Sequence, residues 1–315
     1  TAIRCTFTDC PVAFYAQAPG CTMKECTIFY HKHNPAGATA IKLASAQCAV
    51  IGPGELEQDS PGGASGPASC TCISIQNAAD YSVVTDTHIS DWSTGIDFSQ
   101  GGGSTNSQVR NCEIQSFLTA INIQVNGHDG AAISGVKVIS SVLARSNDSY
   151  MSMTPTPVVL IDPNGADNEA INDVTLLGCT VYMMGNANYP YMAGQHGLQI
   201  NGGTNIKVIG GTYSNNNPAS GAGIAITAAC GDIQIIGVNL QPMYDNGTVT
   251  STTQCQAYGL LVTTNPATNM RILVRDCDMR GYQPITGCGV TEVFSSSETA
   301  RCARFTVQFH DFMRA

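Results

Sequence analysis

A spacing that recurs without matching identities constrains this chain more than any other feature. Residues 84–89 read VTDTHI and residues 109–114 read VRNCEI, so apolar, small and apolar residues fall at the same places 25 residues apart. The template apolar-x-x-small-x-apolar also fits residues 7–12, 23–28, 138–143, 176–181, 208–213, 235–240 and 274–279. Such a repeat is typical of solenoids, in which each unit stacks on the previous one and only inward positions must match.

A second short element follows most copies of the template. It reads TGIDF, TAINI, HGLQI, AGIAI and YGLLV in turn, with the alternation of a short strand. Charged residues make up only 12% of the chain and Gly accounts for 32 of 315 residues, which favours turn-rich strands over helices. The sequence therefore predicts an all-β solenoid, a parallel β-helix of about nine to eleven coils that stack about 4.8 Å apart. One β-helix domain is expected over residues 1–315, as a segment of a longer chain.

The 14 cysteines fit the interior of such a coil. Cys26, Cys112, Cys179 and Cys277 stand at the small position of the template, where a free thiol packs as a small hydrophobe. We therefore expect packing residues rather than a disulfide framework, and a chain that folds in a reducing cytoplasm. Paired ligands at the spacing of a closed metal site are missing from the sequence, so neither a metal nor a cofactor is predicted.

The charge and hydropathy of the chain argue against two kinds of partner. The net charge is −9 with only 14 Lys and Arg residues, which disfavours a nucleic-acid surface. The sequence contains no run of 18 apolar residues, so membrane insertion is not expected.

Two stretches carry a resemblance to known proteins. Residues 203–216 (GTNIKVIGGTYSNN) and 230–240 (CGDIQIIGVNL) resemble coils of the pectate-lyase-like right-handed β-helix superfamily, and within it the tailspike and tail-fibre proteins of bacteriophages. The resemblance implies a single-stranded right-handed β-helix, a homotrimer on the virion tail, and action outside the cell. Members of this group bind, cleave or epimerise acidic polysaccharides. The resemblance rests on the coil pattern and includes no active-site signature.

Neither end of the predicted coil looks closed. Residues 1–12 already fit the template, and residues 301–315 still alternate. An open β-helix exposes strand edges and apolar core, so we expect neighbouring segments of a longer chain or partner subunits to cover both ends.

Outward carboxylates are the catalytic candidates. Asp276 and Asp278 alternate on one predicted strand, which would separate them by about 6.5 to 7 Å, the lower edge of an inverting glycosidase pair. Asp86 and Glu113 fall on adjacent coils beside His88, and a carboxylate next to an imidazole can perform general acid–base chemistry. Solvated surface acids are the alternative interpretation of the first pair, and a surface hydrogen-bonded pair is the alternative for the second group.

Aromatic, amide and further carboxylate side chains are the candidates for substrate binding. Some face outward on the strand that follows the template, and others lie in insertions that should emerge on one side as a rim. Tyr rings beside polar groups can stack on sugars and bond their hydroxyls, although such aromatics can also close loops or meet a partner chain. The single Trp can equally be a turn residue packed over the edge of the coil. The candidates are Trp92, Asp97, Asn122, Tyr182, Tyr189, Tyr191, His196, Tyr244 and Asp245.

Three functions remain open on this sequence. The favoured one is a virion-associated spike or fibre that recognises a bacterial surface polysaccharide, with other virion or tail proteins as partners. The second is a carbohydrate-active enzyme on the same scaffold, a polysaccharide hydrolase, lyase or epimerase. Hydrolysis is preferred to lyase chemistry because no cluster of Asp residues resembles a Ca²⁺ cage. The third is a purely structural virion component.

Overall fold

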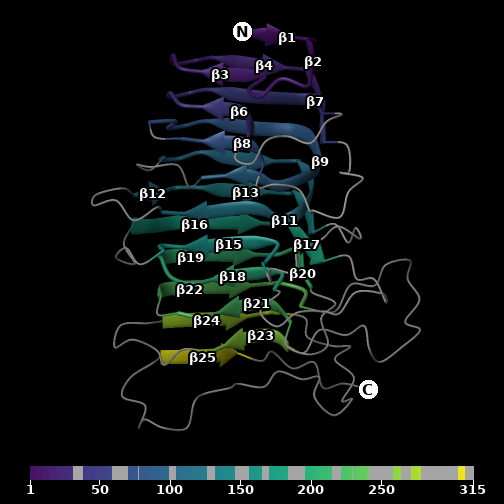
Figure 1. Ribbon diagram of the computed structural model, residues 1–315. Coiled ribbons are helices and arrows are strands. Elements are labelled where there is room, and N and C mark those ends of the chain that lie inside the picture. The colour runs from purple at the N-terminus through teal and green to yellow at the C-terminus, as the bar shows by residue number, and fades with distance from the viewer. Residues whose placement is uncertain are drawn as a thin grey trace, which may run out of the picture.

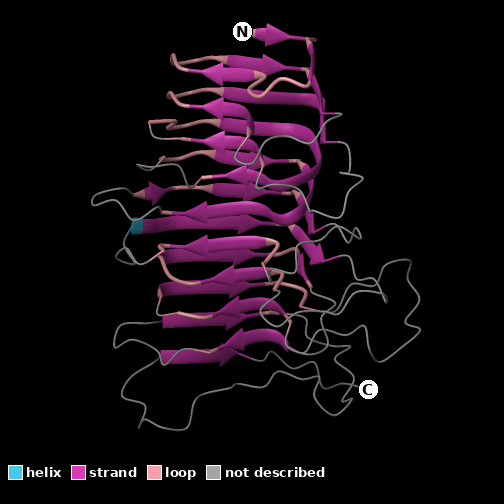
Figure 2. Ribbon diagram, viewed as in Figure 1, coloured by secondary structure: helices cyan, strands magenta, loops and turns pink. Residues whose placement is uncertain are grey.

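The structure is a computed structural model. It describes residues 1–30, 38–58, 70–76, 78–98, 104–125, 132–145, 156–164, 170–183, 196–214, 221–228, 230–240, 258–263, 271–277 and 304–308. About two thirds of these residues are strand and the rest are mostly turns and connections, and none of them forms a helix long and apolar enough to cross a bilayer (Figure 2).

The chain winds into a right-handed parallel β-helix, with the N-terminal coil at one end of the stack (Figure 1). Each coil contributes strands to three faces, which follow one another along the chain as face 1, face 2 and face 3. Every pairing between coils is parallel, because each strand hydrogen-bonds to its equivalent on the next coil. The architecture therefore confirms the predicted all-β solenoid.

The strands of each face stack in chain order. Face 1 consists of β1 (Ala2–Ile3), β4 (Thr22–Lys24), the start of β7 (Ala49–Gln58), the start of β9 (Val83–Asp97), β10 (Gln108–Arg110), β13 (Lys137–Ile139), β16 (Ile171–Leu177), β19 (Thr204–Ile209), β22 (Gly231–Ile236), β24 (Arg271–Arg275) and β25 (Arg304–Gln308). A short strand, β12 (Ile133–Ser134), leads into this face beside the start of β16. Within the described ranges, face 1 thus stacks eleven strands, in agreement with the expected number of coils.

Three long strands run through the corners: β7 passes from face 1 into face 2, β9 passes through all three faces, and β11 passes from face 2 into face 3. Face 2 consists of β2 (Thr6–Thr8), β5 (Thr27–Tyr30), the end of β7, the middle of β9, the start of β11 (Glu113–Gln124), β14 (Val142–Arg145), β17 (Thr180–Met183) and β20 (Thr212–Tyr213). Face 3 consists of β3 (Phe14–Ala16), β6 (Thr39–Leu43), β8 (Thr71–Ile75), the ends of β9 and β11, β15 (Val159–Asp162), β18 (Leu198–Ile200), β21 (Ala222–Ile226) and β23 (Tyr258–Val262).

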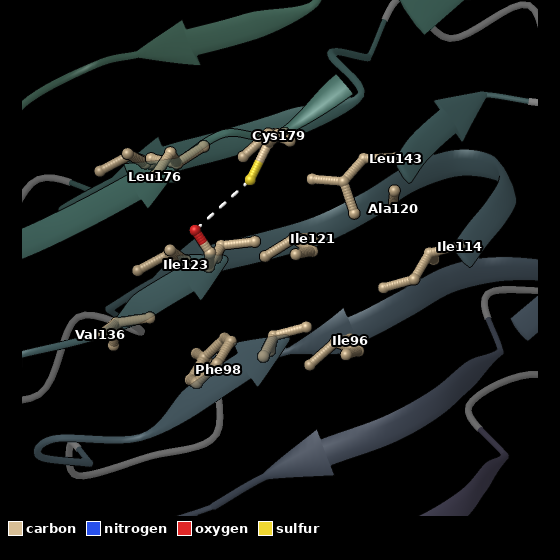
Figure 3. Packing of buried hydrophobic residues seen from close by; sticks show 14 of the residues in the cluster. Ile96, Phe98, Ile114, Ala120, Ile121, Ile123, Val136, Leu143, Leu176 and Cys179 are labelled. Carbon is tan, nitrogen blue, oxygen red and sulfur yellow. Dashed lines mark hydrogen bonds between the residues drawn. The ribbon is translucent and has the colours of Figure 1, made fainter. Parts of the chain in front are cut away.

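Inward side chains form continuous columns that make up the core. On face 3 one column reads Ile41, Ile73, Ile96, Ile121, Val159, Leu198, Ile224 and Leu260, all buried. Figure 3 shows part of this core, with the Cys179 thiol pointing inward and donating to the carbonyl oxygen of Val138 at 3.4 Å. Each fully buried aliphatic side chain stabilises the fold by about 1.5–3 kcal/mol relative to exposure.

A left-handed residue forms the corner between faces 1 and 2 in most coils. Positive φ angles of 47° to 56° recur at the non-glycine corners, and glycines take the same place in later coils. This corner column reads Arg4, Glu25, Asp86, Asn111, Ser140, Gly178, Gly210, Gly237 and Asp276. Only Gly adopts this conformation freely, and Asn and Asp tolerate it best among the others, so the column explains the third position of the sequence template.

In most coils the residue after the corner is a Cys, Thr or Ser that points inward and bonds the backbone. Its thiol or hydroxyl donates to the carbonyl oxygen two residues earlier, as in Cys26 to Lys24 (3.2 Å), Thr87 to Thr85 (3.0 Å) and Ser141 to Ile139 (3.0 Å). Cys, Ser and Thr therefore interchange here because each is small and carries a donor. Every cysteine among the described residues is free, and most are buried, so the predicted interior thiols are confirmed.

In the first coil, the copy of the template lies five residues earlier than the sequence alignment placed it, at residues 2–7 instead of 7–12. Phe7 pairs with Ile28 in register, so Phe7 ends the template rather than beginning it. The small position of the first coil is therefore Cys5, while Cys10 follows a second left-handed residue, Asp9, at the end of β2.

Candidate functional site

A column of ionisable side chains runs along the outer surface of face 2. Glu55 pairs in register with His88, which pairs with Glu113, so the three side chains stand on successive coils. His88 Nδ1 lies 3.5 Å from Glu113 Oε2, and the two side chains are 41% and 51% exposed. Gln115 adds an amide, whose Nε2 donates to Glu113 Oε1 at 3.4 Å. These groups are accessible and can donate to or accept from a ligand.

Asp86 lies beside this column, at the corner that precedes it. The hydroxyl of Thr85 donates to Asp86 Oδ2 at 2.7 Å, and the Nδ2 of Asn111 on the next coil donates to Asp86 Oδ1 at 3.3 Å. The backbone φ of Asp86 is 55°, so a left-handed corner conformation sets the direction of its side chain. The structure thus brings Asp86, His88, Asn111 and Glu113 onto one surface of two adjacent coils, as the sequence spacing implied.

We call Glu55, Asp86, His88, Glu113 and Gln115 the face-2 patch. Glu55 is the residue that sequence reasoning missed. It lies in the segment GPGEL, which carries an extra residue at the corner: Ile51 pairs with Thr85, and Gly54, three residues on, pairs with Thr87. That insertion hides the alignment of Glu55 with His88, which only the register reveals.

Asp276 belongs to the other pair of catalytic candidates, and like Asp86 it is a corner residue. Its φ is 56°, and Arg275 Nε lies 2.9 Å from its Oδ2. Because Asp276 follows β24 in a left-handed conformation, the spacing of an extended strand does not apply to Asp276 and Asp278. Asp278 lies outside the described residues.

Face 3 carries the outward ladder that the sequence placed there. Asp97 pairs with Asn122, and the column continues through Leu160, Gln199, Ala225 and Leu261. Asn122 Nδ2 donates to Asp97 Oδ1 at 3.0 Å, and Asp97 is only 6% exposed. At the far end, Ala225 and Leu261 are buried in a small separate apolar cluster with Ala222. Asp97 therefore offers little surface to a ligand.

Trp92 lies inside the coil. Its side chain has no exposed surface, its Nε1 donates to the carbonyl oxygen of Leu56 at 2.9 Å, and its ring meets that of Tyr30 edge-on at 5.1 Å. Trp92 pairs with Ser116 just where the register between β9 and β11 shifts. This position does not suit the sugar-stacking role suggested by the sequence.

His196 is also buried, with 4% of its surface exposed. Its Nδ1 accepts the backbone N–H of Ala222 at 3.2 Å. Burial lowers the pKa of His196 to about 4, so the imidazole is neutral at pH 7. His196 thus joins two coils rather than facing a ligand.

The remaining rim candidates are mostly outside the described residues. Tyr182 lies on β17 and is partly buried, whereas Tyr189, Tyr191, Tyr244 and Asp245 are not described. In the described part of the chain, no group of three or more His, Cys, Asp and Glu side chains is arranged to hold a metal ion.

Arg145 ties the ends of the insertion that follows β14. Its Nε donates to the carbonyl oxygen of Phe117 at 2.9 Å, and its Nη1 donates to that of Thr156 at 2.8 Å. Burial lowers the pKa of Arg145 to about 10, which still leaves the guanidinium charged at neutral pH. The flanks of residues 146–155 are therefore anchored to the coil below.

Comparisons with known proteins bear on the fold. The sequence matches no protein-family model and no curated protein. Among solved structures, the chain is similar to tailspike protein 2 of Escherichia coli O157:H7 bacteriophage CAB120, with a TM-score of 0.51 and 11% identity over 81% of this chain and 38% of that one. The chain thus spans well under half the length of this tailspike.

Two further solved structures show weaker likeness to the chain. The Dettilon tailspike protein matches with a TM-score of 0.30 and 11% identity, over 80% of this chain and 61% of that one. The A-module of a mannuronan C-5 epimerase from Azotobacter vinelandii matches with a TM-score of 0.29 and 12% identity, over 84% of each chain.

Proposed function

We propose that this chain is the β-helix of a virion-associated spike or fibre that recognises a bacterial surface polysaccharide. The observation that carries the proposal is the face-2 patch, an exposed row of hydrogen-bonding groups on a rigid scaffold. Its members are spaced by the rise of the coil, about 4.8 Å, so they can contact successive parts of an extended chain. The likeness in fold to a phage tailspike supports the same assignment.

The patch also limits the sugar that it would accept. Glu55, Asp86 and Glu113 are carboxylates, which accept hydrogen bonds from sugar hydroxyls or ammonium groups. Like charges placed close together repel one another, so the segment held here would be neutral or carry amino groups. Acidic sugars of the same polymer would lie elsewhere on the surface.

The proposal includes an assembly and a location. The spike would be a homotrimer attached to other virion or tail proteins, would fold in a reducing cytoplasm before release, and would act outside the cell. The free interior thiols support folding under reducing conditions. Residues 1–315 would form one β-helix domain of a longer chain.

A second function rests on the pair His88 and Glu113. An imidazole 3.5 Å from a carboxylate, with Asp86 on the neighbouring corner, is a set of groups that can exchange protons with a glycosidic oxygen or a water molecule. On this alternative the chain is a depolymerase, and hydrolysis is favoured over lyase or epimerase chemistry. Glu113 and Asp86 would be its acid and base.

The test uses the capsule and lipopolysaccharide of candidate hosts. Purified chain and the variants Glu55→Gln, Asp86→Asn, His88→Gln and Glu113→Gln are assayed for binding and for the chain length of the recovered glycan. Asp232→Asn serves as a matched control, since Asp232 is an exposed carboxylate paired with Arg271 at 3.0 Å on face 1.

The outcomes separate the alternatives. Binding that is weakened at least tenfold by the face-2 variants, without shortening of the glycan, supports recognition. Shortening that is lost in Glu113→Gln or Asp86→Asn supports the depolymerase. Binding that is unchanged in all face-2 variants would overturn the assignment of the patch, because the glycan would then be held elsewhere. Binding that is absent with every glycan would overturn recognition and leave a structural virion component.

A further inference from the structure

Two stacked cysteines lie near the N-terminal end of the coil. Cys21 immediately precedes β4 and Cys48 immediately precedes β7, and the register pairs Thr22 with Ala49. The backbone N–H of Ala49 donates to the carbonyl oxygen of Cys21 at 2.9 Å, so Cys21 and Cys48 occupy equivalent places on successive coils.

The side chain of Cys48 is directed toward the neighbouring coil. Its thiol donates to the carbonyl oxygen of Ala18 at 3.5 Å, as well as to that of Ala46 on its own coil at 3.7 Å. Burial is the main cause that raises the pKa of the Cys48 thiol, and a side-chain hydrogen bond with Cys21 contributes to the rise. The register and the backbone bond between the two coils therefore place the two side chains at equivalent positions of adjacent coils.

Cys21 is the accessible member of the pair. It is partly buried and packs against the core, whereas Cys48 is fully buried. Equivalent residues on adjacent parallel strands are about 4.8 Å apart at Cα, within the range of about 4.4–6.8 Å seen for disulfides.

We propose that Cys21 and Cys48 form a redox-convertible pair, which a low-molecular-weight disulfide oxidises to a bond between two successive coils. This inference is independent of the proposed function. It concerns covalent modification of the scaffold and involves no residue of the face-2 patch.

The chemistry is a thiol–disulfide exchange in two steps. The Cys21 thiolate attacks one sulfur of the small disulfide, forming a mixed disulfide and releasing one small thiol. The Cys48 thiolate then attacks the Cys21 sulfur, forming the Cys21–Cys48 bond and releasing the second small thiol. One small disulfide is reduced to two thiols, two protein thiols are oxidised, and their two protons remain with the released thiols.

Cys5 and Cys26 are also stacked on successive coils, since Thr6 pairs with Thr27 and the backbone N–H of Thr27 donates to the carbonyl oxygen of Cys5 at 2.9 Å. Cys112 lacks such a neighbour and provides an internal control. It occupies the small position after the corner, between Thr87 and Ser141, so its neighbours on both adjacent coils carry hydroxyls. Burial raises the pKa of the Cys112 thiol to about 11. Cys112 therefore has neither a partner thiol on an adjacent coil nor ready reactivity.

The experiment treats the full chain with oxidised glutathione at mildly alkaline pH. Free thiols are blocked with N-ethylmaleimide, first in the native state and then after unfolding, and the digest is mapped by mass spectrometry. We expect loss of label at both Cys21 and Cys48, a linked peptide that contains both, and a Cys112 that is labelled only after unfolding.

Two variants make the result specific. Cys48→Ser should accumulate glutathione on Cys21, because the resolving thiol is gone, whereas Cys112→Ser should form the linked peptide like the parent chain. If Cys48→Ser does not fold, Cys21→Ala replaces it as the test, because Cys21 is only partly buried. In Cys21→Ala we expect no linked peptide and a free thiol at Cys48. The proposal is overturned if the parent chain yields Cys21 and Cys48 free or singly capped by glutathione, or if the link joins two separate chains.

Discussion

At the scale of single residues, the corner between faces 1 and 2 decides which side chains each coil can use. The corner residue must accept a positive φ, and the next one must be small enough to turn inward while donating to a carbonyl. These two demands explain why Asp86 and Asp276 recur at one place in the repeat: Asp is among the residues that best tolerate a left-handed backbone. A carboxylate at this corner thus has a structural reason to be present, whatever its chemistry.

The corner can be tested at Gly210, whose φ is 60°. A Cβ built there meets no atom within 4 Å, so any cost of a side chain is conformational rather than steric. Gly210→Ala should lower the free energy of unfolding by about 1 kcal/mol, and Gly210→Asn by less, since Asn111 occupies the equivalent corner. Denaturant midpoints measure both, and equal midpoints for Ala and the parent chain would contradict the corner requirement.

At the scale of strands, the apolar spacing predicts most of the architecture. The alternating outward ladder from Asp97 to Leu261 and the inward thiols follow directly from period-two alternation on stacked strands. The structure differs from the sequence-based prediction where the register between neighbouring strands shifts. The extra residue before Gly54 and the irregular pairing around Ser116 move Glu55 into the patch and Trp92 into the core, and neither shift changes the local apolar pattern. A single sequence therefore locates strands better than it locates the side chains beside a bulge.

Arg145 provides the test at this scale, because it ends β14 and holds the carbonyls of Phe117 and Thr156. Arg145→Met keeps much of the side-chain volume but removes both donors. We expect a loss of roughly 2–4 kcal/mol in the free energy of unfolding, since buried carbonyls lose their partners. Lys137→Met is the control, because Lys137 is exposed and its replacement should change stability by no more than about 0.5 kcal/mol. Equal midpoints for the two variants in urea would refute the anchoring role.

At the scale of the whole molecule, stability depends on bonds that join one coil to the next. His196 makes two of them: its carbonyl oxygen accepts from Val158 N–H at 3.0 Å, and its Nδ1 accepts from Ala222 N–H at 3.2 Å. The second bond needs a neutral imidazole, since a protonated ring has no acceptor nitrogen. Protonation of this buried ring would therefore break the bond between His196 and the coil that carries Ala222.

The stability of the stack should consequently depend on pH. The pKa of His196 falls from 6.5 to about 4 on folding, so between these values the unfolded chain binds more protons than the folded one. This contribution is fully present above pH 6.5 and is lost as the pH falls toward 4, amounting to about 3 kcal/mol at most. Urea midpoints across this range should decline with acidity in the parent chain and decline less in His196→Asn. Parallel declines in both proteins would contradict the assignment.

The strict register between coils has one more consequence, for how such a surface can change over time. The backbone fixes the spacing of the face-2 patch, because Glu55, His88 and Glu113 stand on consecutive coils of one stack. Removing one complete coil would shorten this row of side chains by one interval, and duplicating one would lengthen it, while every other contact stays in phase. On the proposed function, the repeat length of the polymer that the patch accepts would then change by gain or loss of a coil, independently of the chemistry of each side chain.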